Sequence, residues 1–152
     1  MASDSTREKI AAALKTAVAK ITSVKTVTRT WPSLASLAQF GDPQFPVIAV
    51  VAGLPVPFEF KRSGRRPSTV DVVRSALRVS LYLYDRVAED DGDSRLSDLA
   101  DDVWAAVWAD STVGGLVDEF SASFPDEVAT IDPYIVARLE VRVQYRHDTR
   151  GI

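Results

Sequence analysis

The chain has 152 residues, of which 46% are apolar and 26% are charged, and its formal net charge is −3. This length and balance are typical of one globular domain and exclude a collagen-like repeat, a coiled coil and disorder along the whole chain. No apolar run approaches the ~20 residues that span a bilayer, and the polar start lacks the apolar core of a secretory signal. We therefore expect a single domain over residues 1–152 that stays in the compartment where it is made.

The reactive side chains of the sequence are too few for most kinds of catalytic site. The chain has no cysteine and a single histidine, His147, which lies five residues from its C-terminal end. A disulfide framework, a cysteine-ligated zinc site and a thiol nucleophile are therefore excluded. A serine–histidine pair would depend on His147, in a part of the chain that is often mobile. We expect no enzyme, no catalytic residue, no cofactor and no metal ion.

The first part of the chain predicts a helix followed by a strand. Ser5 and Glu8 have the spacing of a capping box, and apolar residues recur every three or four positions after them. This pattern predicts an amphipathic helix over about 5–22. The β-branched segment 24–30 is expected to be a strand.

The next segments read as short elements broken by proline and glycine. Residues 33–40 could form one or two helical turns. The apolar run 47–51 is typical of a buried strand that stops at Gly53. Residues 54–60 alternate in polarity, but their two prolines confine them to a sheet edge or an extended arm.

A basic cluster follows this arm, at about 61–69. Its glycine and proline predict a flexible loop. One interpretation is a solvated loop, and the other is non-specific contact with phosphates or with an acidic partner. The candidate contact residues are Lys61, Arg62, Arg65 and Arg66.

Two segments, 77–84 and 135–146, alternate between apolar and polar residues with a period of two. They predict long strands in a sheet with one covered face and one face that is wet or contacts a partner. Arg78, Tyr82 and Tyr84 lie on the polar side of the first strand. Because exposed tyrosine and arginine are enriched at interfaces, these three residues are candidates for a subunit or partner interface.

Between these strands an apolar stripe predicts a second helix that is capped by Asp93 or Ser94 and ends near Asp110. The acids at 89–93 lack the ligand spacing of a calcium loop and are interpreted as a solvated turn. A short strand is expected at 126–131. Together these elements predict an α+β fold of the α/β-sandwich type, in which a mixed, largely antiparallel sheet has two main helices packed on one face.

Two pairs of side chains on the second helix invite a functional interpretation. Trp104 and Trp108 share a helical face and could stack on single-stranded nucleic acid. Packing in the core, or burial of this face against a neighbouring subunit, is the favoured interpretation. Asp101 and Asp102 are adjacent and do not face one another, so we interpret them as solubilising surface and not as an acid–base pair.

The end of this helix carries the most distinctive segment. Residues 110–117 read D-S-T-V-G-G-L-V after an alanine-rich helix. The segment resembles the tail terminator and tail-completion (head–tail joining) family of tailed bacteriophages. Its surroundings are similar too: an N-terminal amphipathic helix, a proline-led strand at 46–51, a long strand closing on 82–85 and a final alternating strand reaching 143–146. The motif positions are Asp110, Thr112, Gly114 and Gly115, and our physical account of them is turn geometry.

The resemblance implies a structural virion protein. Such a protein has a sheet with helices on one face and assembles as a homo-hexameric ring. The ring caps the tail tube and provides the surface for joining the head. The implied partners are other copies, the tail tube protein and the head–tail connector or neck protein, with non-specific contact with passing DNA as a further candidate and no membrane. The implied location is the tail or neck of the virion, after assembly in the host cytoplasm.

Two alternatives stay open. One is a neck or head-completion protein of the same fold. The other, from a different class, is a nucleic-acid-binding module that uses the basic loop at 61–66. The salt dependence of any binding would separate the second alternative, because phosphate contacts weaken steeply as salt rises.

Overall fold

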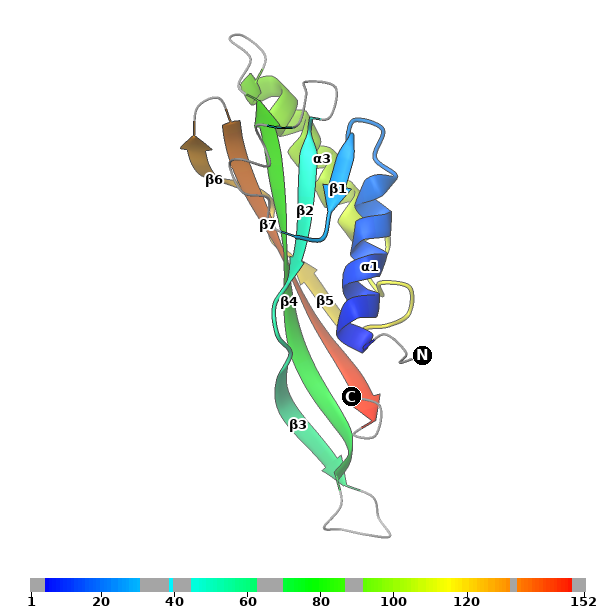
Figure 1. The fold of residues 1–152 in the computed structure, drawn as a ribbon. Coiled ribbons are helices and arrows are strands. Elements are labelled where there is room, and N and C mark those ends of the chain that lie inside the picture. The colour runs from blue at the N-terminus through cyan, green and yellow to red at the C-terminus, as the bar shows by residue number, and fades with distance from the viewer. Residues whose placement is uncertain are drawn as a thin grey trace.

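A computed structural model of the chain describes residues 5–30, 39, 45–62, 70–86, 92–131 and 134–148 (Figure 1). In this part of the chain, seven strands form one sheet, and two helices cover it. In chain order the elements are α1 (Thr6–Ala19), β1 (Thr26–Thr28), β2 (Val47–Ala52), β3 (Val56–Arg62), β4 (Val70–Arg86), α3 (Gly92–Ala109), β5 (Glu119–Ala122), β6 (Asp126–Ile131) and β7 (Tyr134–Asp148).

The sheet has the order β1-β2-β4-β7-β5, with β3 pairing with β4 and β6 pairing with β7. The pairing of β1 with β2 is parallel, and every other described pairing is antiparallel. Both helices lie on the same side of the sheet (Figure 1). The predicted α+β fold, with a mixed and largely antiparallel sheet, is therefore confirmed.

The long strands β4 and β7 form the spine of the sheet. They pair from Val72 opposite Asp148 to Arg86 opposite Tyr134. Both predicted strands are present, and both are longer than the alternation indicated. The extra length of β4 comes from its first residues, which pair with β3 on one side and with β7 on the other. We call β3 and residues 70–76 of β4 the arm, and Figure 1 shows it projecting beyond the ends of both helices.

The main core lies between the helices and the sheet. Every second residue of β4 and β7 points into it, as period-two alternation requires. The helices contribute residues at spacings of three and four, which is the period of a helix face. The core residues from α1, β4, α3 and β7 include Ile10, Leu14, Val18, Leu77, Val79, Leu81, Leu83, Leu99, Val103, Val107, Leu139, Val141 and Val143.

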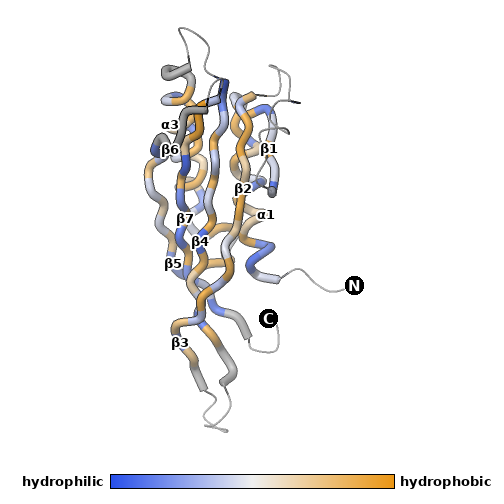
Figure 2. The backbone as a smooth tube through the Cα atoms, turned by 60° about the vertical axis from the view of Figure 1, so that its left-hand side comes forward, coloured by the Kyte–Doolittle hydropathy of each residue, from blue (hydrophilic) through white to orange (hydrophobic). Residues whose placement is uncertain are grey.

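The opposite side of the sheet, which we call the open face, is not wet along its whole length. A second cluster of buried residues lies there, made of Phe45, Val47, Ala49, Tyr84, Tyr134 and Val136. It explains why β2 is apolar at every position, as Figure 2 shows by hydropathy, because β2 is covered on both faces. The predicted face, which was expected to be wet or to contact a partner, is instead covered by the chain itself at the end of the sheet that carries β2.

The start of α1 is fixed by side chains that the sequence pattern singled out. The Ser5 hydroxyl accepts a hydrogen bond from the Glu8 backbone N–H at 3.2 Å, as a capping residue does. The Glu8 carboxylate does not complete the capping box, since it binds the Arg29 guanidinium at 2.8 Å. Arg29 also donates to the Val50 carbonyl, so the helix start is tied to β2.

Several predicted boundaries need correction. The helix α3 begins at Gly92, so Asp93 and Ser94 lie inside its first turn and neither is the cap. The expected loop at 61–69 begins later than predicted, because Lys61 and Arg62 are the last residues of β3 and pair with β4. Apart from residue 39, the helical turns expected at 33–40 lie outside the described residues.

Candidate interaction surfaces

The arm carries exposed apolar side chains that its own chain leaves uncovered. Val56 is 62% exposed, Phe58 45% and Phe60 60%, and Leu54 just before the strand is 81% exposed. In the described part of the chain β3 pairs only with β4, so its other edge is open. The prediction of an edge strand for 54–60 is confirmed. An exposed apolar strip on an open edge is unusual in a protein that works alone.

The two faces of the arm differ. Phe60 is the register partner of Val73 and therefore points to the helix side of the sheet. Glu59 is the partner of Arg74 on the open face, and their side chains form an ion pair at 3.4 Å. The Arg74 guanidinium also lies 5.6 Å from the centre of the Phe58 ring.

A second apolar surface lies at the opposite edge of the sheet, where α3 meets β5. It contains Trp104, Trp108, Phe120 and Phe124, which we call the aromatic shelf. The ring centres of Trp104 and Trp108 are 5.5 Å apart, and Phe120 meets Trp108 edge-on at 4.9 Å. Trp108 is 37% exposed and Phe124 49% exposed. The predicted core packing therefore holds for Trp104, which lies against the main core, and only partly for Trp108.

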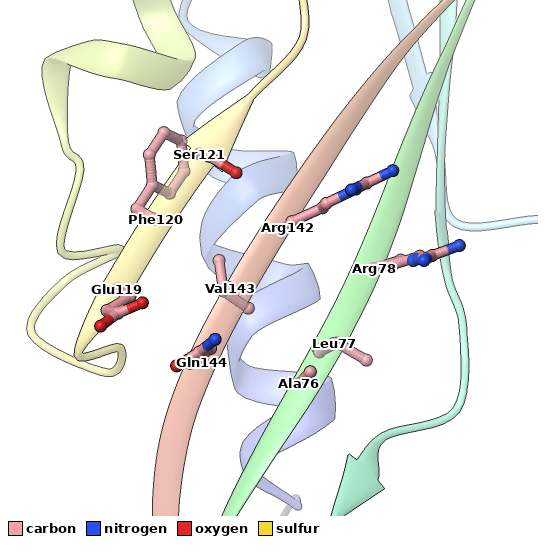
Figure 3. Close-up of a pocket in the computed structure, with 9 residues that line it drawn as sticks. All are labelled: Ala76, Leu77, Arg78, Glu119, Phe120, Ser121, Arg142, Val143 and Gln144. Carbon is pink, nitrogen blue, oxygen red and sulfur yellow. The ribbon is translucent and has the colours of Figure 1, made fainter. Parts of the chain in front are cut away.

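The open face below the second cluster carries a ladder of charges. Glu140 binds Arg78 at 3.5 Å and Arg142 at 3.3 Å, and Asp118 binds Arg146 at 3.1 Å. A shallow pocket of about 270 Å³ crosses β5, β7 and β4 here. Figure 3 shows Arg78 and Arg142 pointing away from α1 on the same side of the sheet. Because the acids and cations alternate, this surface is mixed in charge and is not a basic track.

The three residues predicted as an interface have different environments. The Arg78 side chain is 71% exposed and available to a partner. Tyr82 is half-buried. Tyr84 is only 3% exposed and belongs to the second cluster, so it is not a surface residue. The period-two pattern placed it correctly on the open face, but the pattern carries no information about what covers that face.

The Tyr84 hydroxyl has no hydrogen-bond partner among the described residues. Removal from water, with a smaller contribution from Tyr82, raises the pKa of Tyr84 from 10.0 to about 12. Burial also raises the pKa of Tyr145, on the helix side of the sheet, although the cation of Arg7 acts in the opposite direction.

The segment after α3 forms a tight turn. The Asp110 carboxylate accepts from the Gly114 backbone N–H at 2.7 Å and from the Thr112 hydroxyl at 3.0 Å. The Thr112 hydroxyl in turn accepts from the Gly115 N–H at 3.2 Å. The φ angles of Gly114 and Gly115 are +67° and +81°, values that favour glycine. The four motif residues thus lie together, and their contacts fix the connection from α3 to β5.

The remaining candidates give no reactive site within the described residues. Asp101 and Asp102 are both exposed on α3. No group of three acidic or histidine side chains is arranged as metal ligands there. The backbone of His147 lies in β7 opposite Val73, and Arg65, Arg66 and the acids 89–91 lie outside the described residues. None of the described helices has the length and apolar character needed to cross a bilayer.

Sequence reasoning missed the exposed phenylalanines of both surfaces. Phe58 and Phe60 alternate around Glu59 directly after two prolines, and Phe120 and Phe124 follow the double glycine. These spacings were the sequence signals of the two apolar surfaces. The exposure of the phenylalanine side chains, however, depends on where the helices end. In comparisons with known proteins, no protein-family model and no curated sequence matches the chain.

Proposed function

We propose that the chain is a structural subunit of a phage tail, a tail terminator that forms a ring on the end of the tail tube and presents the surface to which the head joins. The observation that carries this proposal is the projecting arm, on which Val56 and Phe60 are 62% and 60% exposed. Exposed apolar patches of this kind mark surfaces that bind a partner. The resemblance of residues 110–117 to the tail terminator family supports a phage tail as the assembly.

The position of the two exposed surfaces supports a ring. The arm lies at one edge of the sheet and the aromatic shelf lies at the other. Two different patches on one chain favour head-to-tail contacts, and such contacts close into a ring when the rotation between copies permits. A two-fold dimer would instead need one patch that fits itself.

The packing of the sheet and its contacts with α1 fit a structural role. The sheet is packed on both faces over β2, and Arg7 and Arg29 tie the start of α1 to the end of β2 through backbone carbonyls. In the proposed ring, one rim meets the last ring of the tube and the other meets the connector. β3 ends at Arg62, and in the proposed ring the basic cluster that begins at Lys61 would contact the tube or the DNA channel.

Removing the gene from the phage that carries it tests this proposal. We expect overlong tail tubes, or tails that never join heads, and restoration of normal particles when the gene is supplied separately. Normal virions without the gene would refute the proposed function. Tails of normal length that fail to join heads would assign the chain to the neck.

A further inference from the structure

We propose that the arm of one copy pairs with β5 of the next, so that β3 and β5 join neighbouring sheets edge to edge and Phe60 packs on the aromatic shelf. This inference deepens the proposed ring and rests on it. The occupant of both exposed surfaces is therefore a second copy of this chain.

Both strands have an edge that the described residues leave unpaired. β3 pairs with β4 alone, on the side away from β7, and β5 pairs with β7 alone, on the side away from β4. β3 runs antiparallel to β4, whereas β5 runs parallel to β4, because both β4 and β5 are antiparallel to β7. When copies are related by rotation about an axis that runs roughly along the strands, β3 of one copy meets β5 of the next in an antiparallel sense. Antiparallel pairing is the commoner kind.

The exposed side chains lie on matching faces. Phe60 shares a face with Val73, and Phe120 shares a face with Val143, and both of these partners point to the helix side. A continuous sheet keeps its faces from copy to copy. Phe60 of one copy would therefore meet Phe120 and the exposed edge of Trp108 in the next, within the reach of an aromatic cross-strand pair.

One register satisfies all of these contacts. If Phe60 lies opposite Phe120, antiparallel pairing places Glu59 opposite Ser121 and Lys61 opposite Glu119. Glu59, Ser121 and Glu119 are exposed, and the partners of Glu59 and Ser121 on β4 and β7 place both on the open face. The opposite charges of Lys61 and Glu119 in this register give the charge complementarity that selects a partner edge.

The register also fixes the inclination of the strands. Within one copy, Phe60 lies level with Val73 of β4, whereas Phe120 lies level with Leu77, four residues further along. This offset is about 13 Å along the strands. From one copy to the next, the sheet extends sideways by four strand spacings, which is about 19 Å. A closed ring with this register therefore inclines its strands by about 35° to the ring axis, close to the tilt of strands in closed barrels.

Disulfide trapping tests the inference directly, because the wild-type chain contains no cysteine. The variants Glu59→Cys and Ser121→Cys place one thiol on each exposed edge and leave Phe60 and the shelf intact. Equal amounts of the two purified variants are mixed and oxidised, and the disulfide-linked dimer is measured by non-reducing electrophoresis. We expect it to form at least tenfold faster than in a control mixture in which Asp101→Cys, exposed on α3, replaces Ser121→Cys.

Two further variants sharpen the test. Phe60→Ser in the Glu59→Cys chain is expected to slow the cross-link at least tenfold, while a far-ultraviolet spectrum and a melting temperature near the parent's show that the fold is kept. The double variant Glu59→Cys with Ser121→Cys is expected to give a ladder that ends at a closed ring. Equal rates in the test and control mixtures would overturn the inference, as would Glu59→Cys cross-linking fastest to itself, which would indicate arm-to-arm pairing.

These outcomes are separate from the fate of the proposed function. Cross-linking uses the purified chain alone, whereas the proposed function is tested by particles that lack the gene. A trapped ring together with normal gene-deleted virions would refute the tail role and leave the pairing in place. Defective tails without the selective cross-link would refute the pairing alone.

Discussion

Replacing Tyr84 with phenylalanine should stabilise the fold at neutral pH. The Tyr84 ring is buried in the second cluster, where it packs with Val47, Ala49 and Val136, but its hydroxyl has no partner among the described residues. A buried hydroxyl without a hydrogen bond costs about 1–3 kcal/mol. Tyr84→Phe removes this cost and keeps the ring, so we expect the free energy of unfolding to rise by about 1 kcal/mol at pH 7.

The difference between the two proteins should widen in alkali. The pKa of Tyr84 is raised from 10.0 to about 12 in the folded chain, so the folded state holds the phenolic proton more tightly than the unfolded state. The resulting stability is fully present below pH 10 and is lost as the pH rises through 12. At pH 11 the wild type should have lost about 1.4 kcal/mol through this residue, and Tyr84→Phe none.

Urea unfolding of both proteins at pH 7 and pH 11, followed by circular dichroism, measures these differences. Tyrosines other than Tyr82, which interacts with Tyr84, contribute equally to the two proteins and cancel in the comparison. Tyr84→Ala serves as the matched control, since losing the whole ring should destabilise the fold by about 3–5 kcal/mol. A Tyr84→Phe protein less stable than the wild type at pH 7, or a difference that stays constant up to pH 11, would refute the burial of this hydroxyl.

Three further predictions concern the core, the turn after α3 and the basic cluster at 61–69. Leu81→Ala, at a position with no solvent exposure, should lower the free energy of unfolding by about 2–5 kcal/mol in the same urea assay; a cost below 1 kcal/mol would contradict the packing. Asp110→Ala removes two hydrogen bonds of the turn and should cost about 1–2 kcal/mol, whereas Asp110→Asn should recover part of it. Changing Arg62, Arg65 and Arg66 together to alanine should lower the yield of joined, infectious particles; an unchanged titre would exclude a role for these cations in assembly or DNA passage.

The strands were the most predictable part of the fold. The period-two pattern of 77–84 and 135–146 located β4 and β7, because a sheet with one apolar face leaves that signature in the sequence. The buried strand β2 was found from its unbroken apolar run. The short strand β5 was missed, since four residues after a double glycine carry too little alternation to distinguish a strand from a loop.

The surfaces were less predictable because they depend on contacts between distant elements. Tyr84 follows the same alternation as Arg78, yet only Tyr84 is covered, by residues of β2 and β7 that are far away in sequence. Lys61 and Arg62 have the composition of a loop, but pairing with β4 extends β3 through them. The exposure of Phe60 follows from the helices ending before the arm does, which no local pattern reports.

We propose that copies of this chain form a ring at the head-proximal end of a phage tail tube. Electron cryomicroscopy of the intact virion tests the presence of this ring. We predict a six-fold ring between tube and connector whose density fits the sheet, both helices and the arm, with the arm of each copy against β5 of its neighbour. A tube that meets the connector without such a ring, or a ring there whose density fits a different fold, would contradict the account.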